Sequence, residues 1–139
     1  MKHLMLVLGL ALHVLSCEVS PSLIDALIEV ESHGRDDAVG DGGKSIGCLQ
    51  IQKAVVDDVN FYFPNADFEY DDRWDRNCSR AICRLYLSHW GDVYESRSRT
   101  APSDEVLSRI WNGGPEGYKR PETISYWIKV RSVLKFRRD

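Results

Sequence analysis

"VESHGRDDAVGDGGKSIGCLQI", residues 30–51, decides the fold, because a helical pattern ends in it and a second apolar run begins at its far end. The stretch holds one Glu, three Asp and five Gly. Glycine adopts backbone conformations that other residues resist, so we expect an irregular or hairpin-like segment over residues 35–47. An ionised carboxylate next to an apolar core is energetically costly, so the carboxylates in this stretch call for an explanation.

The segment before this stretch predicts a helix that begins at Ser20 and Pro21 and ends at Gly34. Serine is a favourable N-cap, proline is tolerated at the first helical position, and glycine commonly ends a helix. Apolar residues recur at helical spacing at Leu23, Ile24, Leu27 and Ile28. Glu31 continues that spacing, so we expect its carboxyl on the apolar face of the helix.

The remainder of the chain reads as further helices separated by loops. One helical pattern covers residues 51–62, a second includes residues 82–86 and ends near Gly91, and a third begins at Ser103 and stops at residues 112–115. A last helix is predicted to start at residues 121–123. We therefore expect a single α+β domain, predominantly helical, with a small β segment after the first helix.

The N-terminus has the pattern of a secretory signal over residues 1–16, which leaves residues 17–139 as the domain. An apolar run follows Lys2 and is too short to span a bilayer. The sequence "VLSC" also resembles a bacterial lipoprotein signal, in which Cys17 would be lipidated. The alternative is ordinary secretion with Cys17 free or disulfide-paired. Both readings predict a secreted or extracytoplasmic protein, and the first adds membrane attachment through Cys17.

Composition excludes some classes of function. The formal net charge is −3 and no Lys/Arg stripe is present, which argues against nucleic-acid binding. The four cysteines would allow three pairings, although Cys78 and Cys83 point to different faces of one predicted helix and are poor partners for each other. No zinc-ligand spacing is present, so we expect no structural metal.

Two carboxylates of the opening stretch are candidates for chemistry. An acid on an apolar helix face holds its proton near neutral pH, as the general acid for glycosidic cleavage must. For Glu31 the alternative is a half-exposed residue at a helix end. Glycoside hydrolases commonly need a second carboxylate. Asp41, between Gly40 and Gly42, is the best placed, and an Asx-type turn is the alternative for it.

Three segments carry a family resemblance. "VESHG…GDGGKSIGCLQI" resembles the catalytic stretch of the lysozyme superfamily, in which a helix ends in Glu-Ser and a glycine-rich turn leads to Gly-x-x-Gln. "IWNGGPEG" and "PETISYWIKV" are similar to C-terminal patterns of invertebrate-type lysozymes and lytic transglycosylases. The resemblance spans about residues 22–131 and implies a lysozyme-like fold.

The resemblance also implies roles for single residues. Glu31 would be the proton donor, and the other matching positions near the substrate are Ser32, Gln50, Asn112, Gly113 and Tyr126. Side-chain amides suit N-acetyl groups and hydroxyls, and a tyrosine can hydrogen-bond a carboxyl. The chain departs from the goose-type pattern at Gln52, where a second aspartate would stand. We expect Trp111 and Trp127 to pack in the core.

Together these observations predict a peptidoglycan hydrolase (muramidase) that cleaves the β-1,4 bond between N-acetylmuramic acid and N-acetylglucosamine. Glu31 would be the general acid, and Asp41 would stabilise the developing cation or direct the water. The enzymatic alternative is a lytic transglycosylase, in which Glu31 acts as acid and then base. A non-catalytic wall-binding module is the third reading. We expect a monomer that acts on peptidoglycan strands without a cofactor.

Overall fold

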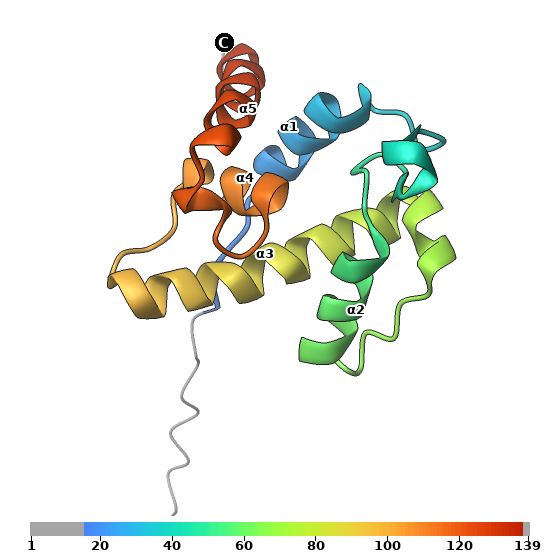
Figure 1. The fold of residues 1–139 in the computed structure, drawn as a ribbon, viewed down its shortest axis with the longest axis horizontal. Helices are drawn as coiled ribbons and strands as arrows, with labels where there is room; N and C mark the ends of the chain where they lie inside the picture. Colours follow the sequence, from blue (N-terminus) through green and yellow to red (C-terminus); the bar gives the residue numbers. More distant parts are fainter. Residues whose placement is uncertain (1–15, 138–139) are drawn as a thin grey trace, which may run out of the picture.

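The structure, a computed structural model, describes residues 16–137, so nearly all of the predicted signal segment lies outside the described residues. The described chain forms a helical domain with one two-stranded sheet (Figure 1). Its helices are α1 (Pro21–Ser32), α2 (Lys53–Tyr62), α3 (Arg76–Ser98), α4 (Asp104–Gly113) and α5 (Ile124–Phe136). The strands are β1 (Val39–Gly40) and β2 (Ser45–Ile46). This architecture confirms the predicted fold class.

Helix α3 is the long element on which the others are arranged (Figure 1). Helices α1, α2 and α4 all contact it, and α5 packs on α1 and α4. The hairpin and α2 lie toward one end of α3, whereas α4 and α5 lie toward the other (Figure 1). One helix therefore carries both halves of the molecule.

Helix α1 begins and ends as its sequence predicts, to within two residues. The Ser20 Oγ accepts a hydrogen bond from the backbone N–H of Leu23 at 3.1 Å, which confirms the N-cap. The helix ends at Ser32 because His33 and Gly34 both take left-handed backbone conformations, with φ of 53° and 79°. The chain turns away directly after the residue pair that contains Glu31.

The turn-rich segment forms the predicted hairpin. Strand β1 pairs antiparallel with β2, Val39 opposite Ile46 and Gly40 opposite Ser45. Ile46 then forms an isolated antiparallel bridge with Ile51, with N···O distances of 3.2 and 3.0 Å. The hairpin is thereby continued by the chain that leads into α2.

Two side chains fix the hairpin segment against the helices. The Ser32 Oγ, which is buried, donates to the carbonyl oxygens of Ile28 at 3.2 Å and Cys48 at 2.8 Å. The Arg76 guanidinium at the start of α3 pairs with Asp36 at 2.9 Å. Because both ends of the segment are held, the residues between them have a defined position relative to α1.

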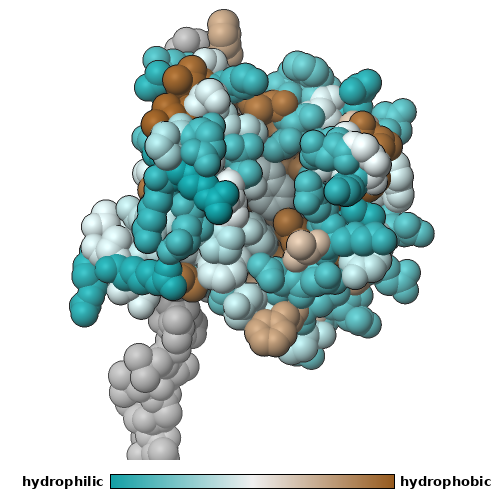
Figure 2. Space-filling model, in the orientation of Figure 1, coloured by the Kyte–Doolittle hydropathy of each residue, from teal (hydrophilic) through white to brown (hydrophobic). Residues whose placement is uncertain are grey.

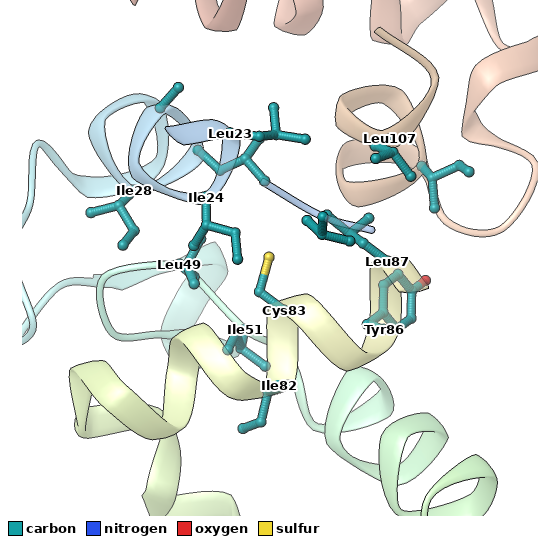
Figure 3. Packing of buried hydrophobic residues seen from close by; sticks show 14 of the residues in the cluster. Leu23, Ile24, Ile28, Leu49, Ile51, Ile82, Cys83, Tyr86, Leu87 and Leu107 are labelled. Carbon is teal, nitrogen blue, oxygen red and sulfur yellow. The ribbon is translucent and has the colours of Figure 1, made fainter. Parts of the chain in front are cut away.

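The core lies between α1, α3 and the ends of the other helices. Figure 3 shows Ile24 of α1 and Leu49 of the loop on one side of Cys83, with Ile51 and Ile82 on the other. The largest side chains in it with less than 2% exposure are Leu23, Leu27, Leu49, Ile51, Ile82, Leu87 and Ile110. All of them except Leu49 lie in segments for which the sequence predicts a helix, so the periodicity identified most of the core.

The expected end of α3 at Gly91 is wrong, because the helix continues to Ser98. Gly91 is a site of close packing: a Cβ there would lie 2.6 Å from the Cys17 Sγ and 3.2 Å from a methyl of Leu107. The helix ends instead where Arg99 takes a left-handed conformation with φ of 61°. In the sequence, a glycine that allows close packing of another segment cannot be distinguished from a glycine that ends a helix.

The last two helices follow the sequence more closely. Ser103 caps α4 by accepting from the N–H of Val106 at 3.2 Å. The expected start of the final helix at Pro121 is early, because Pro121–Thr123 forms a separate 3₁₀ turn before α5 begins at Ile124. The loop from residue 114 to 120 folds back on α4 through the 3₁₀ turn Gly117–Lys119.

The cysteines and the surface complete the description. Cys17, Cys48, Cys78 and Cys83 are free thiols, of which Cys48 and Cys83 are buried. Among residues 16–137, no helix is long and apolar enough to cross a membrane. The same residues contain no cluster of three or more His, Cys, Asp or Glu side chains that could hold a metal ion.

Gly47→Ala should destabilise the protein by roughly 3 kcal/mol, the sum of a left-handed backbone penalty and a steric overlap. Gly47 has φ of 78°, and a Cβ there would overlap the carbonyl oxygen of Arg73. Gly34→Ala is the matched control, with φ of 79° and open space around the position. It should lose only roughly 1–2 kcal/mol. Urea denaturation measures both, and equal losses would contradict the packing explanation.

Candidate active site

An open cleft of about 390 Å³ lies between the end of α1, the hairpin, the start of α2 and the end of α4. Figure 2 shows this face hollowed between the part that carries α4 and α5 and the part that carries α2 and the hairpin. The polar and aromatic residues that line it include Glu31, Asp41, Ser45, Gln50, Gln52, Trp111 and Asn112. Residues far apart in the sequence thus meet in one groove.

Glu31, in the last turn of α1, presents its carboxyl to this cleft. The pKa of Glu31 is raised from 4.5 to about 7, chiefly by burial, and the negative charge of Asp41 acts in the same direction. Hydrogen bonding from Tyr126 and Trp111 acts in the opposite direction. Burial has the larger effect, so a substantial fraction of Glu31 carries its proton near neutral pH.

Tyr126 of α5 holds the Glu31 carboxyl in place. Its hydroxyl donates to the Glu31 Oε1 at 2.7 Å. Burial raises the pKa of Tyr126 well above its ordinary value, and the adjacent charge of Glu31 acts in the same direction. Tyr126 therefore keeps its proton near neutral pH and serves as a hydrogen-bond donor there. It acts on the carboxyl and lies outside the cleft lining.

Asp41 lies on the hairpin side of the cleft, in a left-handed conformation with φ of 50°. Its carboxylate accepts from the Ser45 Oγ at 2.5 Å and from the Gln52 Nε2 at 3.5 Å. An Asx turn would instead direct the carboxylate to the backbone N–H groups that follow it. The observed bonds go to the side chains of Ser45 and Gln52, and the carboxylate lines the same cleft as Glu31.

Ser45 and Gln52 are site residues that sequence reasoning missed. Gln52 also donates to the Ser45 Oγ at 3.3 Å, so the two side chains and Asp41 form one network. Gln52 was considered only as the place of an absent aspartate. The alternation of residues along the short strands could have shown that Ser45 and Gln52 share a face, once the register of the pairing was known.

Gln50 lines the cleft, but its amide nitrogen serves the hairpin. The Nε2 donates to the carbonyls of Ala38 at 3.2 Å and Gly47 at 3.0 Å. Its Oε1 lies so close to Gly40 that a Cβ at that glycine would overlap it. The amide nitrogen of Gln50 thus braces the hairpin that carries Asp41, and the expected contact of Gln50 with the saccharide stays a prediction.

Two other expected substrate contacts lie elsewhere. Ser32 is 3% exposed and bonds to the backbone of α1 and of the loop, so it positions the helix end and is out of reach of the cleft. Gly113 packs on Thr123, where a Cβ would lie 2.6 Å from the Cγ2. The neighbouring Gly114 lines the cleft in its place, beside Asn112, which is exposed there as expected.

Trp111 packs against the core as expected, and it also reaches the cleft. Its ring packs edge-on against Tyr86 at 5.7 Å between centroids, yet the residue also lines the cleft. It is half-buried, so one part belongs to the core and another faces the groove. Trp127 is partly buried against the core, in agreement with its expected place. An aromatic face beside the acid offers an apolar surface to a sugar ring.

Comparisons with known proteins give relatives in sequence and in structure, and no family model matches the chain. A lysozyme of Ostrea edulis is 28% identical over 133 residues, covering 91% of this chain and 92% of the relative. A lysozyme of Magallana gigas is 38% identical over 55 residues, which cover 39% of this chain and 34% of that protein. Both matches are to lysozymes of invertebrates, as the three sequence segments indicated.

A similar solved structure is the crystal structure of Aeromonas hydrophila PliI in complex with Meretrix lusoria lysozyme. The match has a TM-score of 0.64 at 24% identity and covers 82% of this chain and 89% of the matched chain. At this identity the likeness shows the fold alone. It confirms the expected lysozyme-like fold.

Glu31→Gln should remove a pH-dependent loss of stability. Because the folded pKa is about 7 against 4.5 ordinarily, unfolding releases a proton between these values. The free energy of unfolding of the wild type should therefore fall as the pH rises from about 4.5 through about 7, and that of the variant should not. Urea denaturation across this range measures it. Glu29→Gln, whose side chain is 45% exposed, is the control and should follow the wild type.

Tyr126→Phe should raise the pKa of Glu31 above about 7, because it removes a donor that stabilises the carboxylate while leaving the burial unchanged. The ¹³C chemical shift of the Glu31 carboxyl, followed by NMR against pH, reports the value. Tyr118→Phe is the control, since that ring packs on Tyr94 at 4.9 Å. An unchanged or lowered pKa would show that the bond to Glu31 has no electrostatic effect.

Proposed function

We propose that this chain, a homologue of the invertebrate lysozymes with a lysozyme-like fold, is a muramidase that hydrolyses the β-1,4 bond between N-acetylmuramic acid and N-acetylglucosamine. The observation that carries the proposal is the sheltered Glu31 carboxyl, which has a pKa of about 7 and faces an open cleft with Asp41 on its other side. The names of the relatives support lysozyme activity as the general class.

In this mechanism Glu31 donates its proton to the glycosidic oxygen as the bond to the leaving sugar breaks. Asp41 is negatively charged across the cleft, where it stabilises the oxocarbenium-like centre or directs the attacking water. Ser45 and Gln52 hold the Asp41 carboxylate at 2.5 and 3.5 Å. Tyr126 keeps the Glu31 carboxyl oriented through the 2.7 Å bond. The reaction uses no cofactor.

The same geometry separates the residues that are available to bind the glycan from those that position the catalytic groups. Asn112 is exposed in the cleft and forms no side-chain hydrogen bond within residues 16–137, so its amide is free for N-acetyl groups and hydroxyls. Trp111 offers the edge of an aromatic ring next to Glu31. Ser32 positions the end of α1 from a buried place, and Gln50 braces the hairpin from the lining of the cleft.

A lytic transglycosylase would use Glu31 as acid and then base, with the muramyl 6-hydroxyl as nucleophile, and it needs no second carboxylate. That route gives no role to Asp41 or to the side chains that hold its carboxylate. Both named relatives are lysozymes. These observations favour hydrolysis, and the product distinguishes the two routes.

We further propose that residues 1–16 are a secretion signal and that residues 17–139 form the secreted domain, a monomer that acts on peptidoglycan strands. The packing of Cys17 favours secretion over lipid attachment. Its backbone N–H donates to Asp92 at 2.5 Å, and its Sγ lies close to Gly91 of α3. A thioether-linked lipid would have to displace this sulfur from the helix.

Product analysis on purified peptidoglycan tests the function. Glu31→Gln should lower the rate by about a thousandfold, the range of a general acid, and Asp41→Asn by about a hundredfold. In the wild type, kcat/KM should fall as the pH rises through about 7, because Glu31 must be protonated. Mass spectrometry should show reducing muramic acid ends.

The exposed Glu29→Gln variant serves as the control for both substitutions and should retain full activity. Products lighter by one water, together with an active Asp41→Asn variant, would assign the protein as a transglycosylase. Undigested walls with the wild-type protein would favour a wall-binding module.

A further inference from the structure

A second hollow, of about 360 Å³, adjoins the catalytic cleft. Two residues, Gln52 and Ala54, line both, so the hollows are continuous along the start of α2. The remaining residues that line the second hollow are Gly43, Lys44, Lys53 and Arg73. We call it the basic hollow. A substrate seated in the cleft beside Gln52 would extend directly to it.

The charge of the basic hollow is opposite to that of the chain as a whole. The chain has a formal net charge of −3, yet the lining holds three cationic side chains and no acidic one. Within residues 16–137, no carboxylate forms an ion pair with Lys44, Lys53 or Arg73, although seven ion pairs occur elsewhere in that range. Three uncompensated cations in one depression form a site for an anion.

Arg73 is the buried member of the group, with 6% of its surface exposed. Its Nε donates to the carbonyl of Tyr70 at 2.6 Å, and its Nη1 donates to those of Ile51 at 3.0 Å and Lys44 at 3.4 Å. These carbonyls fix the guanidinium without cancelling its charge, and no bond from the Nη2 is formed within residues 16–137. A buried cation is costly unless it is paired, so an anion in the hollow would offset that cost.

The first turn of α2 adds to the positive potential. Lys53 and Ala54 open this helix of ten residues, and the side chain of the N-cap residue Gln52 makes no capping bond. The first backbone N–H groups of α2 are therefore not capped by that side chain, and the helix dipole places partial positive charge there. Lys53 is also held near the hollow by its contact with the Tyr70 ring, at 4.8 Å to the centroid.

We propose that the basic hollow binds a carboxylate carried by the muramyl residue of the substrate. A muramyl residue differs from N-acetylglucosamine by a lactyl ether, whose carboxyl group is either free or extended by a peptide that itself bears carboxylates. A glycan that occupies the cleft places such a group beside Gln52. This inference rests on the proposed function and goes beyond it, because it makes the protein selective for muramyl glycans over neutral N-acetylglucosamine polymers.

Binding measured by isothermal titration calorimetry in the Glu31→Gln background tests the proposal without turnover. Three tetrasaccharides serve as probes: chitotetraose, which is neutral, alternating N-acetylglucosamine and N-acetylmuramic acid with free lactyl carboxylates, and the same compound bearing L-Ala-D-Glu. The added pair Lys44→Gln and Lys53→Gln should weaken binding of a muramyl probe about fivefold to tenfold, as expected for two exposed cations. Binding of chitotetraose should not change.

Lys129→Gln is the matched control, since that exposed lysine lies on α5 and takes part in no ion pair within residues 16–137. It should leave all three affinities unaltered. Added salt should weaken the binding of the muramyl probes and leave that of chitotetraose unchanged, because salt screens the interaction between charges. Arg73 is left intact because a change at a buried position could unfold the protein.

A loss confined to the probe with free lactyl carboxylates would support the proposal and assign that group, and a loss confined to the dipeptide probe would support it and assign the peptide carboxylates. A loss on both muramyl probes would support the proposal for either carboxylate. No loss on either, or an equal loss on chitotetraose, would overturn the proposal. The proposed function is tested separately by wall digestion with Glu31 in place. If the wild-type protein digests walls and the lysine substitutions leave all affinities unchanged, the proposed function stands and only this inference is wrong.

Discussion

The hydrogen bond from Tyr126 to Glu31 joins two residues that lie 95 positions apart, at 2.7 Å, and the site depends on it. It requires α5 to pack on α1, which in turn requires the apolar faces of both helices to meet. The buried surroundings that this packing creates raise the pKa of Glu31 to about 7. The packing of the C-terminal helix α5 therefore also sets the pKa of the acid, Glu31.

The opposite wall of the cleft is built by a different principle. The hairpin has strands of two residues each, too short to be stable alone. Its position comes from side-chain bonds to the backbone, with Ser32 holding the Cys48 carbonyl at 2.8 Å and Gln50 holding that of Gly47 at 3.0 Å. Apolar packing thus positions Glu31, whereas hydrogen bonds from polar side chains position the hairpin that carries Asp41.

Much of this could be predicted from the sequence, and the failures have physical causes. Helix caps and apolar faces are local features, so the start of α1 and the position of Glu31 followed from them. Gly91 was misread because a packing glycine and a terminating glycine look alike without knowledge of Cys17. The pairing of Gln52 with Ser45 and Asp41 depends on strand register, and the basic hollow gathers charges from distant parts of the chain.

One long element carries both walls. Helix α3, of 23 residues, is in contact with α2 at one end and with α4 at the other, and it has no proline and no break. Because α3 is unbroken, it provides no hinge between the two walls of the groove. A change in the width of the groove would require α3 to bend or the helices packed on it to shift, which favours a binding groove of nearly constant width.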